Sequence, residues 1–290
     1  MMGGIKTFVR GGAALHVDDS GGGGLPVVFQ HGLCGDAQQT AEAFPVDQGF
    51  RRITLECRGH GASEAGDVSA FSIGTFAEDV AALIEAGDLA PIVVGGISMG
   101  AAIAALLAVH RPDLIRGLIL VRPAWVSHSA PDNMRPYAEV GQFLSALPAD
   151  EAREAFLAGD TAKRLRVEAP DNLASLEGFF ARSQQAITAA LLQRIAADGP
   201  DVSDEELGTI RVPTLIIAHG RDFVHPFALA EGLAALIPGS QLVAITPKAD
   251  DRIRYLSDLR NALGTYLRSS TDGFAGVNMG RRSPDRPTHR

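Results

Sequence analysis

The sequence is short of cysteine, of basic residues and of long apolar runs, and each shortage argues against a class of protein. Only two cysteines occur in 290 residues, so a small disulfide-stapled fold is excluded. Apolar runs reach about ten residues, whereas a bilayer-spanning helix needs roughly 20, so we expect no membrane-spanning segment. The 26 lysines and arginines against 34 aspartates and glutamates give a net charge of −8, which disfavours nucleic acid as a partner.

Targeting and cofactor signals are missing as well. Residues 1–6 read MMGGIK, with no charged segment followed by an apolar core, so we expect a cytoplasmic, reducing compartment. No cluster of side chains has metal-ligand spacing. The glycines of residues 21–24 lack the strand-to-helix context of a dinucleotide site. The sequence therefore predicts neither a metal nor a cofactor.

Strand-sized apolar segments alternate with helix-sized amphipathic ones, which predicts an α/β fold with a mostly parallel eight-stranded sheet and flanking helices. The first two strands form an antiparallel hairpin around the turn Arg10-Gly11-Gly12. The predicted strands are residues 4–9, 13–17, 26–30, 52–56, 91–95, 118–121, 214–218 and 241–245, and the predicted helices are 74–86, 99–110, 226–237 and 252–268.

One long segment breaks this alternation. Residues 124–207 show helical periodicity and no strand pattern, so we interpret them as a helical cap inserted into a core formed by residues 1–123 and 208–268. Both ends of the cap should emerge at one edge of the sheet. The tail 269–290 has few apolar residues, and we expect it to be mobile.

The most informative motif is Gly96-Ile97-Ser98-Met99-Gly100, which follows a predicted strand and opens an Ala-rich helix. A serine on such a sharp turn presents its hydroxyl outward, and glycines two residues away on each side let strand and helix approach closely. Ser98 is therefore the candidate nucleophile.

A second motif, His31-Gly32-Leu33, directly follows another predicted strand. Acyl transfer places negative charge on an oxygen, and two preorganised backbone N–H groups stabilise that charge. Leu33 and Met99 are the candidate oxyanion-hole donors. The His31 side chain is expected to brace its loop beside the pocket, and Trp125 is expected to line the same pocket.

With these motifs the chain resembles the α/β-hydrolase superfamily over residues 4 to about 268. Residues 56–63, ECRGHGAS, resemble the Asp-x-Arg-Gly-His-Gly-x-Ser loop of its esterase, lactonase and carbon–carbon hydrolase branches, with Glu56 in place of the usual Asp. Residues 222–226, DFVHP, match the Asp-x-x-x-Pro turn of that superfamily. The resemblance thus implies that Asp222 is the triad acid.

The sequence departs from the superfamily at the general base. The resemblance implies a histidine after the last strand, where Ala249 or Asp250 stands instead. A serine without an adjacent base is a weak nucleophile. The candidate substitutes are His225, His219 and Asp250, although a carboxylate is a poor base unless burial raises its pKa, and Lys248 beside Asp250 opposes that.

Two kinds of function follow from this pattern. The first is a hydrolase acting through Ser98 on a small carbonyl compound such as an ester or lactone, with an atypical or absent base. The second is a catalytically impaired homologue that binds a small ligand or a protein partner. The intact motifs around Ser98 favour the first, because a pure scaffold would not need them.

Overall fold

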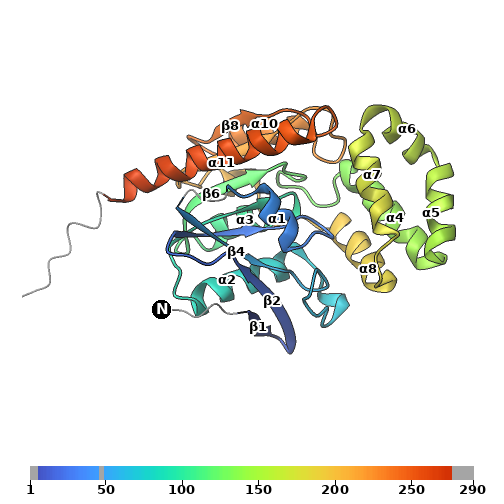
Figure 1. Cartoon of the computed structure of the whole chain (residues 1–290), viewed down its shortest axis with the longest axis horizontal. Coiled ribbons are helices and arrows are strands. Elements are labelled where there is room, and N and C mark those ends of the chain that lie inside the picture. Colours follow the sequence, from blue (N-terminus) through green and yellow to red (C-terminus); the bar gives the residue numbers. More distant parts are fainter. Residues whose placement is uncertain (1–5, 46–48, 276–290) are drawn as a thin grey trace, which may run out of the picture.

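The computed structural model describes residues 6–45 and 49–275, and it contains a single eight-stranded sheet (Figure 1). The spatial order of the strands is β1-β2-β4-β3-β5-β6-β7-β8. Their bounds are β1 Thr7–Arg10, β2 Ala13–Asp19, β3 Leu25–Gln30, β4 Phe50–Leu55, β5 Ile92–Ile97, β6 Ile115–Val121, β7 Thr214–Ala218 and β8 Gln241–Ala244.

The pairing of the strands confirms the predicted fold class. β1 and β2 form an antiparallel hairpin whose turn uses Gly11 and Gly12 at φ 54° and 81°, a region that glycine enters freely. β2 also pairs antiparallel with β4. All remaining neighbours pair in parallel. The carboxyl ends of β3, β5, β6 and β7 therefore meet at one edge of the sheet, where ligands of such sheets bind.

Helices cover both faces of the sheet. The helices of the core are α1 Ala37–Ala43, α2 Ile73–Ala86, α3 Met99–His110, α10 Phe227–Leu236 and α11 Arg252–Ala275, with a short 3₁₀ helix at Val68–Ala70. Buried residues of α2, α3 and α10 belong to one apolar cluster, and those of α1 and α11 belong to another across the sheet. Parallel strands sandwiched in this way are buried on both faces, which explains their continuous apolar runs.

The segment between β6 and β7 is helical. Residues 122–213, all of which the structure describes, contain no strand. They form a 3₁₀ helix at Asp132–Met134 and then α4 Arg135–Ala146, α5 Ala149–Ala158, α6 Asp160–Glu168, α7 Pro170–Phe179, α8 Gln185–Ala196 and α9 Asp204–Leu207. Figure 1 shows α4 to α8 gathered beside one edge of the sheet, and we call α4 to α8 the cap.

Two elements differ clearly from the sequence predictions, and the bounds of most others shift by one to three residues, with β6 beginning at Ile115 rather than at residue 118. α11 continues to Ala275, so the predicted helix end at residue 268 is wrong, and Ser270, although polar, is buried there. α1 was not predicted because its sequence, AQQTAEA, carries no apolar stripe; it begins at Asp36, whose carboxylate accepts from two backbone N–H groups. Residues 269–275 of the tail that was predicted to be mobile belong to α11. Residues 4–5 of the first predicted strand and 276–290 of the tail lie outside the described residues.

Candidate active site

Ser98 lies at the sharp turn between β5 and α3. Its φ of 56° and ψ of −110° are strained for a residue with a side chain. A Cβ on Gly96 would lie 2.5 Å from the backbone of Gly100. A Cβ on Gly100 would lie 2.5 Å from the carbonyl oxygen of Gln30. Close packing of strand and helix thus requires both glycines, and Ser98 itself is only 7% exposed.

The loop after β3 lies against this turn. A Cβ on Gly32 would be 3.5 Å from Cβ of Ser98 and 3.4 Å from the carbonyl oxygen of Ile97. Among residues 6–45 and 49–275, no acceptor is found for the backbone N–H of Leu33 or Met99. Met99 is the first residue of α3, where a helix leaves its N–H groups without internal partners. The two predicted oxyanion donors therefore come from segments that meet at Ser98.

His225, in the loop after β7, connects Ser98 to Asp222. Nε2 of His225 lies 2.8 Å from Oγ of Ser98. Nδ1 of His225 lies 3.0 Å from each carboxylate oxygen of Asp222, and the His225 backbone N–H donates to Oδ1 of Asp222 at 3.0 Å. The three side chains form one hydrogen-bonded chain. Of the three substitutes considered from the sequence, His225 is the one that the structure brings to Ser98.

The other two candidate bases have different partners. Nδ1 of His219 lies 2.7 Å from the carbonyl oxygen of Gly220, and its Nε2 is 3.6 Å from Oδ2 of Asp222, beyond hydrogen-bond distance. Asp250 forms an ion pair with Arg221, and its side chain is 41% exposed. Neither makes a hydrogen bond to Ser98 in the described part of the chain, so the structure does not bring them to that residue.

Arg122 is a site residue that the sequence analysis missed. It directly follows β6 with φ 47° and is buried, 8% exposed. Its Nε and Nη2 both donate to Oδ2 of Asp222, at 2.9 and 2.6 Å, and Nη2 lies 3.2 Å from Nδ1 of His225. The available signal was an arginine directly after the apolar run 118–121, because a charge at that edge needs a buried partner.

Burial and charge act against each other at this site. Burial alone would raise the pKa of Asp222, but His225 and Arg122 outweigh it and hold that pKa well below its usual value. Burial lowers the pKa of His225, Asp222 raises it, and Arg122 lowers it further, with a net decrease. At neutral pH the site therefore holds a charged Asp222 and a neutral His225.

Residues around the cap clamp the loop that carries Asp222 and His225. Oδ1 of Asn172, in α7, accepts from the backbone N–H groups of Phe223 and Val224 at 2.7 and 3.1 Å. Nδ2 of Asn133 donates to the carbonyl oxygen of Val224 at 2.6 Å. The cap thus fixes the backbone on which the imidazole stands.

The loop after β8, where the superfamily resemblance placed the base, contacts the cap instead. Nζ of Lys248 lies 3.0 Å from Oδ1 of Asp171 in α7. This ion pair joins the last loop of the core to the same cap helix that holds the His225 loop.

The two side chains expected at the pocket are both held by backbone groups. Nδ1 of His31 lies 2.8 Å from the carbonyl oxygen of Gly32, and its Nε2 accepts from the Cys57 N–H at 3.0 Å. Burial lowers the pKa of His31, so a neutral ring braces the loop. Nε1 of Trp125 donates to the carbonyl oxygen of Asp198 at 2.9 Å, and Trp125 is buried.

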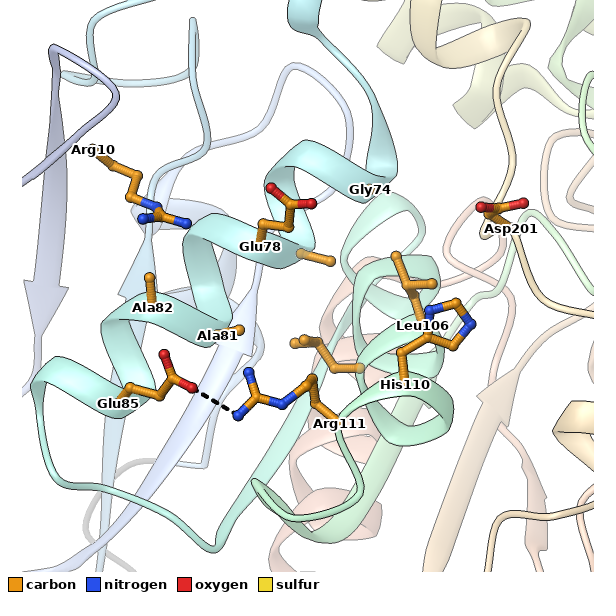
Figure 2. Close-up of a pocket in the computed structure, with 12 residues that line it drawn as sticks. Arg10, Gly74, Glu78, Ala81, Ala82, Glu85, Leu106, His110, Arg111 and Asp201 are labelled. Carbon is orange, nitrogen blue, oxygen red and sulfur yellow. Dashed lines mark hydrogen bonds and ion pairs between the residues drawn. The ribbon is translucent and has the colours of Figure 1, made fainter.

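A surface groove of about 410 Å³ lies elsewhere, between α2 and α3 (Figure 2). Apolar side chains of both helices line it, and Glu85 and Arg111 form an ion pair across it at 2.7 Å. None of its lining residues belongs to the Ser98 site. In the part of the chain that the structure describes, no three His, Cys, Asp or Glu side chains are placed to hold a metal ion, and no helix is long and apolar enough to cross a membrane.

Comparison with known proteins agrees with this architecture. The family model described as the alpha/beta hydrolase fold matches residues 26–249. A non-heme chloroperoxidase of Streptomyces lividans is 31% identical over 208 residues, which cover 69% of this chain and 74% of that protein. Among solved structures, the enol-lactonase of Burkholderia xenovorans matches with a TM-score of 0.65 at 22% identity, covering 93% of this chain and 99% of its own. A thermophilic esterase of Thermogutta terrifontis matches with a TM-score of 0.64 at 24% identity, covering 95% and 97%.

Proposed function

This chain belongs to the α/β-hydrolase fold family, and we propose that it is a serine hydrolase in which Ser98, His225 and Asp222 form the catalytic triad. The observation that carries the proposal is the continuous chain of contacts from Ser98 Oγ through the imidazole to the carboxylate, at 2.8 and 3.0 Å. A nucleophile, its base and the group that orients the base are recognised by this geometry, whatever their order in the sequence.

The hydrogen bonds define the productive form of the imidazole. Because Nδ1 of His225 faces an ionised carboxylate, it carries the proton and donates a hydrogen bond to Asp222. Nε2 is then an acceptor, and the Ser98 hydroxyl donates to it. A neutral His225 in this tautomer is the form that removes the proton of Ser98.

The proposed reaction uses each group in turn. Oγ of Ser98 attacks the carbonyl carbon while its proton passes to Nε2 of His225. The carbonyl oxygen becomes negative and is held by the N–H groups of Leu33 and Met99. His225 then gives the proton to the leaving oxygen, and an acyl-Ser98 intermediate remains. Water then attacks the acyl carbon while its proton passes to the same imidazole. The bond between the acyl carbon and Oγ breaks, the imidazole returns the proton to Oγ, and the acid product leaves.

The proposed substrate is a small carbonyl compound such as an ester or lactone. Ser98 and His225 are 7% and 6% exposed, so a substrate carbonyl that reaches them lies in surroundings largely shielded from solvent. Such a site excludes water and strengthens the electrostatic interactions with a developing oxyanion. The esterase and enol-lactonase named among the structural neighbours act on compounds of this class, which adds support.

Labelling with a fluorophosphonate probe tests the proposal. Wild type should label rapidly, and Ser98→Ala should not label. His225→Ala should label about 10² to 10⁴ times more slowly, the range typical of lost general-base catalysis. Hydrolysis of short-chain esters and lactones should fall in parallel.

The matched control is His219→Ala, which removes a neighbouring buried imidazole with no contact to Ser98 in the described residues. This variant should keep labelling within a few-fold of wild type. Equal labelling of His225→Ala and wild type would show that the imidazole is not the base, and an unreactive wild-type protein would support a ligand-binding homologue instead.

A further inference from the structure

The guanidinium of Arg122 binds one of the two oxygens of Asp222. Both donating groups of the guanidinium point to Oδ2, at 2.9 and 2.6 Å. Oδ1 accepts the backbone N–H of His225 at 3.0 Å, and Nδ1 of His225 lies 3.0 Å from both oxygens. The guanidinium on Oδ2 and the backbone N–H on Oδ1 together fix the rotation in which the carboxylate faces the imidazole.

The backbone around Arg122 shows that this placement is specific. Its φ of 47° lies in the left-handed region, which is unfavourable for a residue with a Cβ. Its backbone N–H donates to the carbonyl oxygen of Ile217 in β7 at 2.7 Å, which holds the turn in place. The strained turn directs the side chain of the residue after β6 across to the loop after β7.

We propose that Arg122 is a positioning residue that orients Asp222 and, through its charge, keeps His225 in the unprotonated form at mildly acidic pH. This inference rests on the proposed triad and adds a residue that determines its working pH range.

The charges around His225 give the physical reason. Four charged or titratable side chains act on His225. Asp222 lies on the same loop as His225, Arg122 follows β6, His219 follows β7, and Asp171 belongs to cap helix α7. In a triad with an unshared carboxylate, the full negative charge stabilises the imidazolium. Here the buried guanidinium already neutralises that carboxylate, so a positive imidazole gains less from it.

The experiment compares Arg122→Met and Arg122→Lys with wild type by the rate of fluorophosphonate labelling between about pH 5 and pH 9, the range in which histidine titrates. In wild type the labelling rate should fall on the acidic side only at a pH below the ordinary pKa range of histidine; we call this fall the acidic limb. Arg122→Met removes the charge, so the limb should move upward by on the order of one pH unit.

Arg122→Lys keeps the charge but loses the planar pair of donors. Its acidic limb should stay near that of wild type, while its plateau rate should fall by about tenfold because the carboxylate is held less well. Circular dichroism checks that each variant folds. If Arg122→Met does not fold, Arg122→Gln carries the same expectation, since its amide can donate to Oδ2 without a charge.

The outcomes separate the two proposals. Labelling of wild type that does not depend on His225 refutes the triad itself. Labelling that depends on His225, with identical acidic limbs in wild type and the uncharged variants, overturns the electrostatic role of Arg122 and leaves the triad standing. An unchanged plateau rate in Arg122→Lys overturns the orienting role.

Discussion

Replacing Asp222 by asparagine tests the structure and the proposed chemistry at once. One carboxylate oxygen accepts from Nε and Nη2 of Arg122, the other accepts from the backbone N–H of His225, and Nδ1 of His225 lies 3.0 Å from both. An asparagine offers a single acceptor oxygen and a donating amide. Whichever way it turns, its NH₂ group meets N–H donors, and the guanidinium of Arg122 loses its buried counter-charge.

The magnitude follows from the burial of the pair. The Asp222 side chain is 1% exposed and that of Arg122 is 10% exposed. Breaking a buried ion pair by removing one charge costs about 3 to 5 kcal/mol. For a chain of this size about 2 °C of melting temperature corresponds to 1 kcal/mol, so we expect Asp222→Asn to melt about 6 to 10 °C lower.

The assay is thermal unfolding followed by circular dichroism, together with fluorophosphonate labelling. The matched control is Asp250→Asn, the same chemical change at an exposed ion pair with Arg221, where the expected cost is about 1 kcal/mol or less. Labelling should fall about 10⁴-fold in Asp222→Asn, because the amide no longer selects the productive tautomer of His225. A melting temperature within about 2 °C of Asp250→Asn would refute the buried pair.

The pH dependence of this difference has a definite sign. The pKa of Asp222 is lowered in the folded protein, so its contribution to the free energy of unfolding is fully present above the unfolded pKa of about 3.9. That contribution is lost progressively as the pH falls further, through the folded pKa. The stability gap between wild type and Asp222→Asn should therefore be constant near neutral pH and shrink below about pH 4.

Three further predictions concern residues around the site. Gly61→Ala should lower the free energy of unfolding, measured with urea, by about 3 kcal/mol or more. The reason is that Gly61 has φ 53° and that a Cβ there would lie 2.1 Å from Cδ of Glu56, so a smaller loss would contradict that packing. Cys34 should resist alkylation at neutral pH by mass spectrometry, since burial raises the pKa of its thiol to about 12, and rapid modification would mean that the loop opens. Asn172→Ala should destabilise by about 1 to 3 kcal/mol, because it leaves the N–H groups of residues 223–224 without their acceptor, and an unchanged melting curve would argue against the clamp.

The fold was predictable because the parallel strands are buried on both faces. Apolar runs such as 118–121 and 214–218 mark strands whose neighbours are helices, and the glycines around Ser98 mark the turn that leaves β5. Each of these signals lies within a few consecutive residues of the sequence. Helix α1 escaped because it is short and polar, and its start depends on the capping carboxylate of Asp36.

The sequence narrowed the candidate base to three residues, but it could not select one of them. His225 and His219 are both within three residues of Asp222, and periodicity does not tell which way a loop side chain points. Their directions depend on contacts distant in the sequence. One of these contacts is made by Asn172, about fifty positions earlier, whose Oδ1 accepts from the backbone N–H groups of residues 223 and 224. The sequence analysis missed Arg122 for the same reason, since its partner Asp222 lies 100 positions away.

Placing the acid and the proposed base on one loop changes what the rest of the site must do. When the two groups come from different loops, each loop must be held separately. Here a single segment, Asp222 to His225, carries both, and its backbone is held by Asn172 in the cap. The loop after β8 contacts the same helix, because its Lys248 pairs with Asp171, the residue next to Asn172. Helix α7 thus contacts both loops through the adjacent residues Asp171 and Asn172, so we expect a change that displaces this helix to disturb His225 as well.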